Sequence, residues 1–155
     1  MSYLDNKYQD SIQGNVISYL KNSFEFSLLF KEGMRINHEC LCIYALSFKR
    51  FKYKVSHSKK YFRELDANIL LGFSINRKVA KATKRNLLKR RIKAIIVDIG
   101  KKIRLQGLTF AFVCRKGVIE WDFYTLKTYI TQTLHTIKKM FLQSARYKNT
   151  RRAQI

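Results

Sequence analysis

The chain has 155 residues, of which 32 are Lys or Arg and 10 are Asp or Glu, so its formal net charge at pH 7 is +22. Hydrophobic residues make up 46% of the sequence, which is ordinary for a folded domain and too high for a disordered basic tail. This charge argues against an enzyme for small cationic or neutral substrates. It favours a polyanionic partner, with nucleic acid as the main hypothesis and an anionic membrane surface as the alternative.

The sequence also bears on where the protein acts. No apolar run approaches the length of about 18 residues that a membrane-spanning helix needs, and the first residues do not resemble a secretory signal. The three cysteines, an odd number, provide no disulfide framework and are typical of a reducing compartment. We therefore expect a cytoplasmic protein that has no membrane partner.

The first part of the chain predicts an extension followed by a helix and a strand. Residues 1–19 are polar and have no clear period, so we expect a poorly ordered N-terminal extension. A helix is expected to begin with Ser23 as its N-cap and to end at Gly33. The short apolar and aromatic pattern from Cys40 to Phe48 predicts a strand.

The middle and the end of the chain alternate between strands and helices. Residues 49–63 hold seven basic side chains and no acid, which predicts a mobile, solvated loop. Strands are expected at Ile69–Ile75 and Leu108–Cys114. A long helix is expected from about Val79 to Ile103, because apolar residues recur every three or four positions from Leu88 to Ile103, as a buried helix face requires. A last helix is expected after Asp122 as N-cap.

These elements predict one domain of the α+β class. We expect an α/β sandwich in the order helix, strands, helix, strand, helix, with a mixed sheet of about four strands on which the helices pack. We expect the domain that binds the polyanionic partner at residues 20–145. Residues 146–155 are expected to form a frayed basic tail.

The segment from Arg77 to Lys93 carries the strongest chemical signal. Its 17 residues include nine positive charges and no acid. From Lys81 onward a basic residue recurs every four positions, which places like charges along one side of a helix and destabilises it unless anions bind there. A phosphate backbone supplies such anions. A merely solvated helix face is the alternative, but solvated faces normally mix the two signs.

The acidic residues do not predict a catalytic site. A protein metallonuclease needs clustered carboxylates, whereas the acids here are scattered, and the N-cap role explains Asp122. His38, Cys40 and Cys42 alternate along the expected strand, but zinc sites usually have a different cysteine spacing, so a zinc site is a minor alternative. We expect no catalytic residue, no metal and no cofactor bound by the protein alone.

Residues 74–93 read SINRKVAKATKRNLLKRRIK. This segment resembles the signature of the protein component of bacterial ribonuclease P, in which Ser-x-x-Lys follows a strand and an Arg-Asn-Arg core comes next. Phe26–Gly33 resembles the first helix of that family, and Cys114–Gly117 resembles a turn before its last helix. Leu87 departs from the pattern because it replaces the second Arg, and the basic segment 49–63 is longer than the common form.

The resemblance implies a protein subunit of the ribonuclease P ribonucleoprotein. Such a subunit binds the catalytic RNA and the 5′ leader of precursor tRNA and so promotes endonucleolytic 5′ maturation of tRNA. The catalytic centre is then expected in the RNA, which also holds the Mg²⁺ of the holoenzyme. No obligate protein partner is evident. A structural RNA-binding protein of ribosomal type is the alternative, since it would share the same charge.

The resemblance also assigns two groups of site residues. The residues predicted to bind the catalytic RNA are Arg77, Lys78, Lys81, Lys84, Arg85, Asn86, Lys89, Arg90 and Lys93. Those predicted to form the leader-binding cleft are Phe26, Phe30, Tyr44, Arg115 and Lys116. Aromatic faces stack on unpaired bases for about 1–3 kcal/mol per base. Phenylalanines four positions apart on a helix are also typical of a core, and the sequence leaves both interpretations open.

Overall fold

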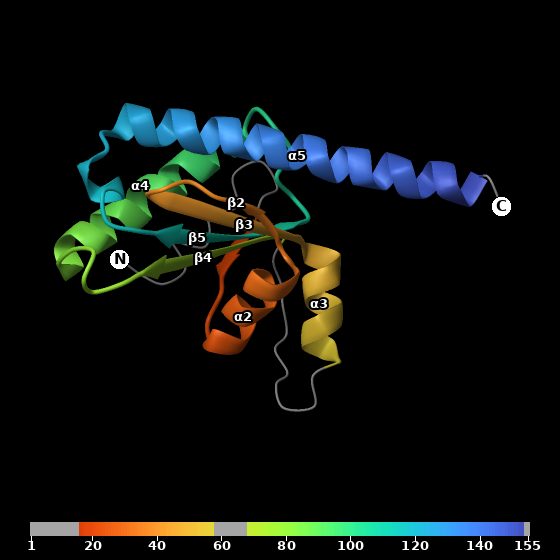
Figure 1. Ribbon diagram of the computed structural model, residues 1–155, viewed down its shortest axis with the longest axis horizontal. Coiled ribbons are helices and arrows are strands. Elements are labelled where there is room, and N and C mark those ends of the chain that lie inside the picture. Colours follow the sequence, from red (N-terminus) through yellow and green to blue (C-terminus); the bar gives the residue numbers. More distant parts are fainter. Residues whose placement is uncertain (1–15, 58–67, 154–155) are drawn as a thin grey trace.

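The computed structural model describes residues 16–57 and 68–153, with side chains described up to residue 144 (Figure 1). Its elements, in chain order, are β1 (Ile17–Tyr19), α2 (Ser23–Glu32), β2 (Met34–Ile36), β3 (Leu41–Ser47), α3 (Phe48–Ser56), β4 (Ile69–Ile75), α4 (Ala82–Gly100), β5 (Leu108–Cys114), the 3₁₀ turn η2 (Val118–Glu120) and α5 (Phe123–Ala153). The predicted α+β class is confirmed.

The strands form one mixed sheet in the order β1-β4-β5-β3-β2. β1 and β5 run parallel to β4, whereas β3 is antiparallel to both β5 and β2. The unit β4–α4–β5 is therefore a parallel crossover, which needs a helix packed on one face of the sheet. The sheet has five strands, close to the expected number of about four. The sequence does not reveal β1 and β2, because they have three residues each and are too short to show a period.

Helices cover both faces of the sheet and create two hydrophobic clusters (Figure 1). The larger cluster lies under α4 and α5 and includes Ile43, Phe112 and Ile92. The smaller one lies under α2 and α3 and includes Leu29, Leu46 and Phe51. Alternate residues of each strand point to opposite faces, so a central strand such as β3 contributes to both clusters.

The first residues of the domain differ from the prediction. Ile17–Tyr19 pairs with Ile69–Leu71 as an edge strand, so the ordered domain starts before residue 20. The N-cap of α2 is Asn22 rather than Ser23, because the Asn22 side chain accepts a hydrogen bond from the Glu25 amide at 3.0 Å. The predicted helix end at Gly33 is confirmed. Residues 1–15 of the predicted extension lie outside the described residues.

The predicted loop at 49–63 is wrong for its first half, since residues 48–56 form α3. The Ser47 side chain caps this helix by accepting from the Arg50 amide at 3.2 Å. Phe48, Phe51 and Val55 recur every three or four positions and are buried against the sheet. The dense positive charge masked this apolar period in the sequence. Residues 58–63 of the predicted loop lie outside the described residues.

The last helix is also longer than predicted. α5 continues to Ala153, so the backbone of the predicted frayed tail is helical up to that residue. The helix crosses the face of the sheet and then projects well beyond it (Figure 1). Among the described helices, α5 included, none combines the length and the apolar character that crossing a bilayer requires.

Candidate nucleic-acid interface

The apolar stripe of α4 is buried, and this fixes where its charges lie. Leu88, Ile92, Ile95 and Ile99 are all less than 5% exposed and pack against the sheet. No apolar face of α4 is therefore left for a membrane, which argues against that alternative. The basic residues occupy the remaining sides. The predicted RNA-binding residues that are exposed are Arg77, Lys78, Lys81, Lys84, Asn86, Lys89 and Arg90.

The turn between β4 and α4 is built by Asn76. Its side-chain oxygen accepts from the Lys78 amide at 3.0 Å, and its carbonyl accepts from the Val79 amide at 2.9 Å. Lys81 is the N-cap residue of α4 but makes no side-chain capping bond. The first turn of α4 contains no acidic residue, so the positive end of the helix dipole adds to the charge of the lysines.

Arg85 differs from its neighbours because it is half-buried. Its Nη1 donates a hydrogen bond to the Ala80 carbonyl at 3.2 Å, which ties the start of α4 to the preceding turn. Among the basic residues that recur every four positions from Lys81 to Lys93, Arg85 therefore uses part of its guanidinium for a hydrogen bond within the protein. Sequence periodicity does not reveal this contact.

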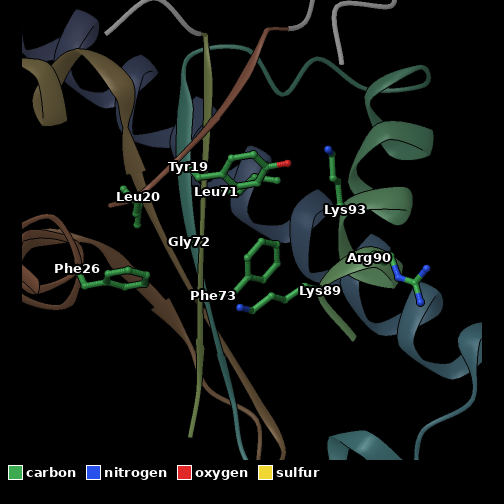
Figure 2. A pocket seen from close by; sticks show the side chains of 9 residues that line it. All are labelled: Tyr19, Leu20, Phe26, Leu71, Gly72, Phe73, Lys89, Arg90 and Lys93. Atoms are coloured by element: carbon green, nitrogen blue, oxygen red, sulfur yellow. The ribbon is translucent and has the colours of Figure 1, made fainter. Parts of the chain in front are cut away.

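A cavity of about 390 Å³ lies where α4 approaches the open edge of the sheet (Figure 2). β1 pairs with β4 only as far as Leu71, so the cavity opens beside the next residues of β4. Basic side chains line one side and apolar or aromatic ones the other. The lining residues are Tyr19, Leu20, Phe26, Leu71, Gly72, Phe73, Lys89, Arg90 and Lys93.

Gly72 allows α2 to approach this cavity closely. A Cβ atom at position 72 would overlap Leu20 and would lie 2.9 Å from the Phe26 ring. The absence of a side chain therefore lets Phe26 lie directly over β4, with its ring at the cavity wall (Figure 2). The cavity thus joins α2 on one sheet face to the basic side of α4.

Three of the predicted cleft residues form a row of aromatic rings. The ring centroids of Phe26 and Phe30 are 6.0 Å apart, and those of Phe30 and Tyr44 are 4.9 Å apart. Phe30 is 43% exposed, and the other two are half-buried. The Arg35 guanidinium lies 5.9 Å from the centroid of the Tyr44 ring, so a cation borders the row. These rings are therefore a partly open surface rather than a closed core.

Arg115 and Lys116 do not join the aromatic row. Arg115 donates from Nη1 to the Asn37 side chain at 3.2 Å and to the His38 carbonyl at 3.3 Å, beyond the end of the sheet. Lys116 lines a hollow of about 330 Å³ together with Lys81 and Lys84 at the start of α4. The structure therefore divides the residues that were predicted to form one cleft.

Leu87 lies in a second hollow on the other side of α4, which it lines with Lys84 and Arg91. Leu87 is 37% exposed and stands beside Ile119. Two cations therefore flank the position where the family signature has its second Arg. This arrangement keeps positive charge at that face of the helix although Leu87 itself is neutral.

Sequence reasoning missed several residues of this region. Tyr19 and Phe73 line the cavity, and Arg35 borders the aromatic row. Tyr19 falls within the predicted poorly ordered extension, because a three-residue edge strand carries too little pattern. Within the part of the chain that the structure describes, no group of three or more His, Cys, Asp or Glu side chains is placed to hold a metal ion.

A mixed sheet with a cationic helix on one face and a row of open aromatic rings on the other defines an RNA-binding domain of the α+β class. The family model described as Ribonuclease P matches residues 17–138. The chain therefore belongs to the ribonuclease P protein family, as its sequence resemblance predicts. Membership gives it a subunit role in tRNA processing, within a ribonucleoprotein.

Individual relatives agree with the family match. The ribonuclease P protein component of Helicobacter hepaticus is 35% identical over 112 residues, which cover 70% of this chain and 75% of that protein. The RNase P protein of Thermotoga maritima has 26% sequence identity and a TM-score of 0.55, with 76% of this chain and 94% of that chain covered. A mutant RNase P protein of Staphylococcus aureus shares the fold at 15% identity, with a TM-score of 0.61 over 89% of this chain and 98% of that chain.

Proposed function

We propose that the chain binds the catalytic RNA of ribonuclease P through α4 and holds the single-stranded 5′ leader of precursor tRNA along the aromatic row. The observation that carries this proposal is the cavity between Phe26 and the basic side of α4 (Figure 2). It connects a surface suited to phosphates with a surface suited to unpaired bases. One protein can therefore contact both RNAs of the enzyme–substrate complex.

The charges of α4 suit a folded RNA. Its exposed Lys and Arg side chains surround the start of the helix, where the helix dipole adds a positive potential. Arg90 offers a planar guanidinium for bidentate contact with phosphate, whereas Lys89 offers a point charge. Neutralising phosphates releases bound counterions, which makes the affinity depend steeply on salt.

The aromatic row suits a leader that has no fixed sequence. Every base has a π-face, so stacking on Phe30 and Tyr44 tolerates any nucleotide. We place hydrolysis of the phosphodiester, and the Mg²⁺ that activates water for it, in the RNA subunit. The protein lowers the repulsion between the phosphates of the two RNAs and positions the leader. We expect the protein to perform this role in the cytoplasm, without a further protein partner.

The affinity of the reconstituted holoenzyme for precursor tRNA, compared with mature tRNA, tests this proposal. Phe30→Ala removes one stacking surface and should weaken precursor binding by about fivefold or more, while mature tRNA binding stays unchanged. Phe123→Ala is a matched control, because Phe123 is also 43% exposed but lies at the start of α5. Equal precursor affinities for the two variants would contradict the leader-binding role.

A further inference from the structure

The helix α3 presents a charged surface that the proposed function does not use. It packs beside α2 on the sheet face opposite α4 (Figure 1). Phe48, Phe51 and Val55 anchor it in the smaller hydrophobic cluster. A helix of nine residues is marginal by itself, so this anchoring gives it a fixed orientation and determines which side chains face the solvent.

One side of α3 is held against α2 by ion pairs. The Glu32 carboxylate of α2 lies 3.3 Å from the Arg50 Nε and 3.2 Å from the Lys54 Nζ. Desolvation by itself would raise the pKa of Glu32, but the hydrogen bonds and charges of Lys54 and Arg50 outweigh it and hold that pKa below its ordinary value. Two of the four cations of α3 are thus used to orient the helix.

The other two cations, Lys49 and Lys52, have no acidic partner among the described residues. Both are exposed, and α3 itself contains no acidic residue. The Lys52 Nζ lies 5.5 Å from the centroid of the Phe48 ring, which positions its stem along the helix. A face that only serves solubility normally mixes charges of both signs, and this one does not.

An aromatic side chain lies beside these lysines. Tyr53 is 52% exposed and stands one helical turn after Lys49, on the same side of α3. Its ring centroid is 4.1 Å from that of His57, which is also exposed, so the two rings pack against each other. Two cations and an open aromatic ring on one rigid helix are the combination that binds single-stranded nucleic acid, through phosphate contacts and base stacking.

We propose that α3 is a second leader-binding element, which contacts the part of the 5′ leader that extends beyond the aromatic row and across α2. This inference rests on the proposed function. The position of α3 favours the leader over the catalytic RNA, because α3 shares a sheet face with Phe30 and lies opposite to α4 (Figure 1). Packed helices are about 8–10 Å apart, so a leader that leaves the aromatic row crosses only one helix before it reaches α3.

The dependence of binding on leader length tests this proposal. We would measure the affinity of the reconstituted holoenzyme for precursor tRNAs whose leaders have about four or about fifteen nucleotides. In the double variant Lys49→Gln/Lys52→Gln, the affinity for the long-leader substrate should fall. The slope of log affinity against log salt concentration should become shallower by about 1.4, the value for two single-strand phosphate contacts. Binding of the short-leader substrate should not change.

Two matched controls separate this effect from a general loss of charge or of aromatic surface. Lys101→Gln/Lys102→Gln removes two exposed lysines after α4 and should affect both leaders equally. Tyr53→Ala should weaken long-leader binding by about fivefold or more, whereas Tyr124→Ala, at a tyrosine that is 78% exposed in α5, should not. Unchanged thermal unfolding midpoints would show that the variants are folded.

The outcomes distinguish the two proposals. If the wild-type holoenzyme does not prefer precursor to mature tRNA, the proposed function fails and the role of α3 fails with it. If that preference exists but Lys49→Gln/Lys52→Gln behaves like the lysine control, only the role of α3 is overturned. An equal loss for long leaders, short leaders and mature tRNA would also overturn it, because α3 would then contact the catalytic RNA.

Discussion

Single side chains decide which parts of this surface are open to solvent. Phe30 is 43% exposed, although it lies one turn from Phe26 on a helix that packs on the sheet. Gly72 lets the Phe26 ring approach β4, and the row then continues through Phe30 to Tyr44 of β3. Arg85, in contrast, is partly used by its bond to the Ala80 carbonyl. Substituting Arg85 therefore removes a structural contact as well as a charge.

The cysteines provide a test of packing at the scale of the residue. Burial raises the pKa of the Cys114 thiol to about 12, although the charge of Lys89 acts in the opposite direction. At pH 8 a thiol with this pKa has a thiolate fraction of about 10⁻⁴, so iodoacetamide should leave Cys114 intact in the folded protein. Cys40 is only half-buried and should react first. Mass spectrometry measures how fast Cys40 and Cys114 are alkylated, and equal alkylation rates would contradict the buried position of Cys114.

The same shift has a defined sign for stability. The folded-state pKa lies above the ordinary value of 9.0, so the unfolded chain releases the proton of Cys114 first as the pH rises. The contribution of this thiol to stability is therefore complete below about pH 9 and is lost toward pH 12. Urea unfolding at increasing pH should show a falling free energy of unfolding in this window.

At the scale of the element, the sequence predicts the long strands of the sheet well but misses the short elements α3, β1 and β2. β4 and β5 have the predicted limits, Ile69–Ile75 and Leu108–Cys114, because each is mostly apolar over seven residues and pairs with a neighbouring strand on both sides. α3 was missed because its basic residues hide three buried apolar positions. The edge strands were missed since three residues carry no measurable period, and their pairing depends on distant partners.

The candidate site was predictable in its residue types more than in its geometry. Charge density identified the start of α4, and the family resemblance identified the three aromatic residues. The cavity depends on Gly72 and on the early end of the β1–β4 pairing, which are tertiary features. For the same reason the sequence placed Arg115 with the aromatic row, whereas its hydrogen bonds lie with Asn37 and His38.

The charges of α4 make a prediction at this scale. Lys89→Ala/Arg90→Ala removes two exposed cations on the cavity side of the helix and should make the log–log salt slope of catalytic-RNA binding shallower by about two. Filter binding at several salt concentrations measures the slope. Lys101→Ala/Lys102→Ala serves as the control beyond the end of α4. A loss of affinity at an unchanged slope would argue against phosphate contacts at this face.

At the scale of the whole molecule, the two faces of one sheet carry two different surfaces, one cationic and one aromatic. A formal net charge of +22 opposes folding by self-repulsion, and the core under α4 and α5 holds the chain together against it. α4 is rigidly placed by the β4–α4–β5 crossover, and α2 carries the aromatic row on the other face. The cavity at the edge of β4 is where these two surfaces meet (Figure 2).

The most direct test of this account is cleavage of precursor tRNA by a bacterial catalytic RNA at low Mg²⁺, with and without the protein. Lowering the repulsion between the two RNAs should let cleavage proceed at Mg²⁺ concentrations where the RNA alone is nearly inactive. We predict a strong stimulation of the cleavage rate that requires the 5′ leader and is reduced by Phe30→Ala. Cleavage at the same rate in the presence and absence of the protein would contradict the account.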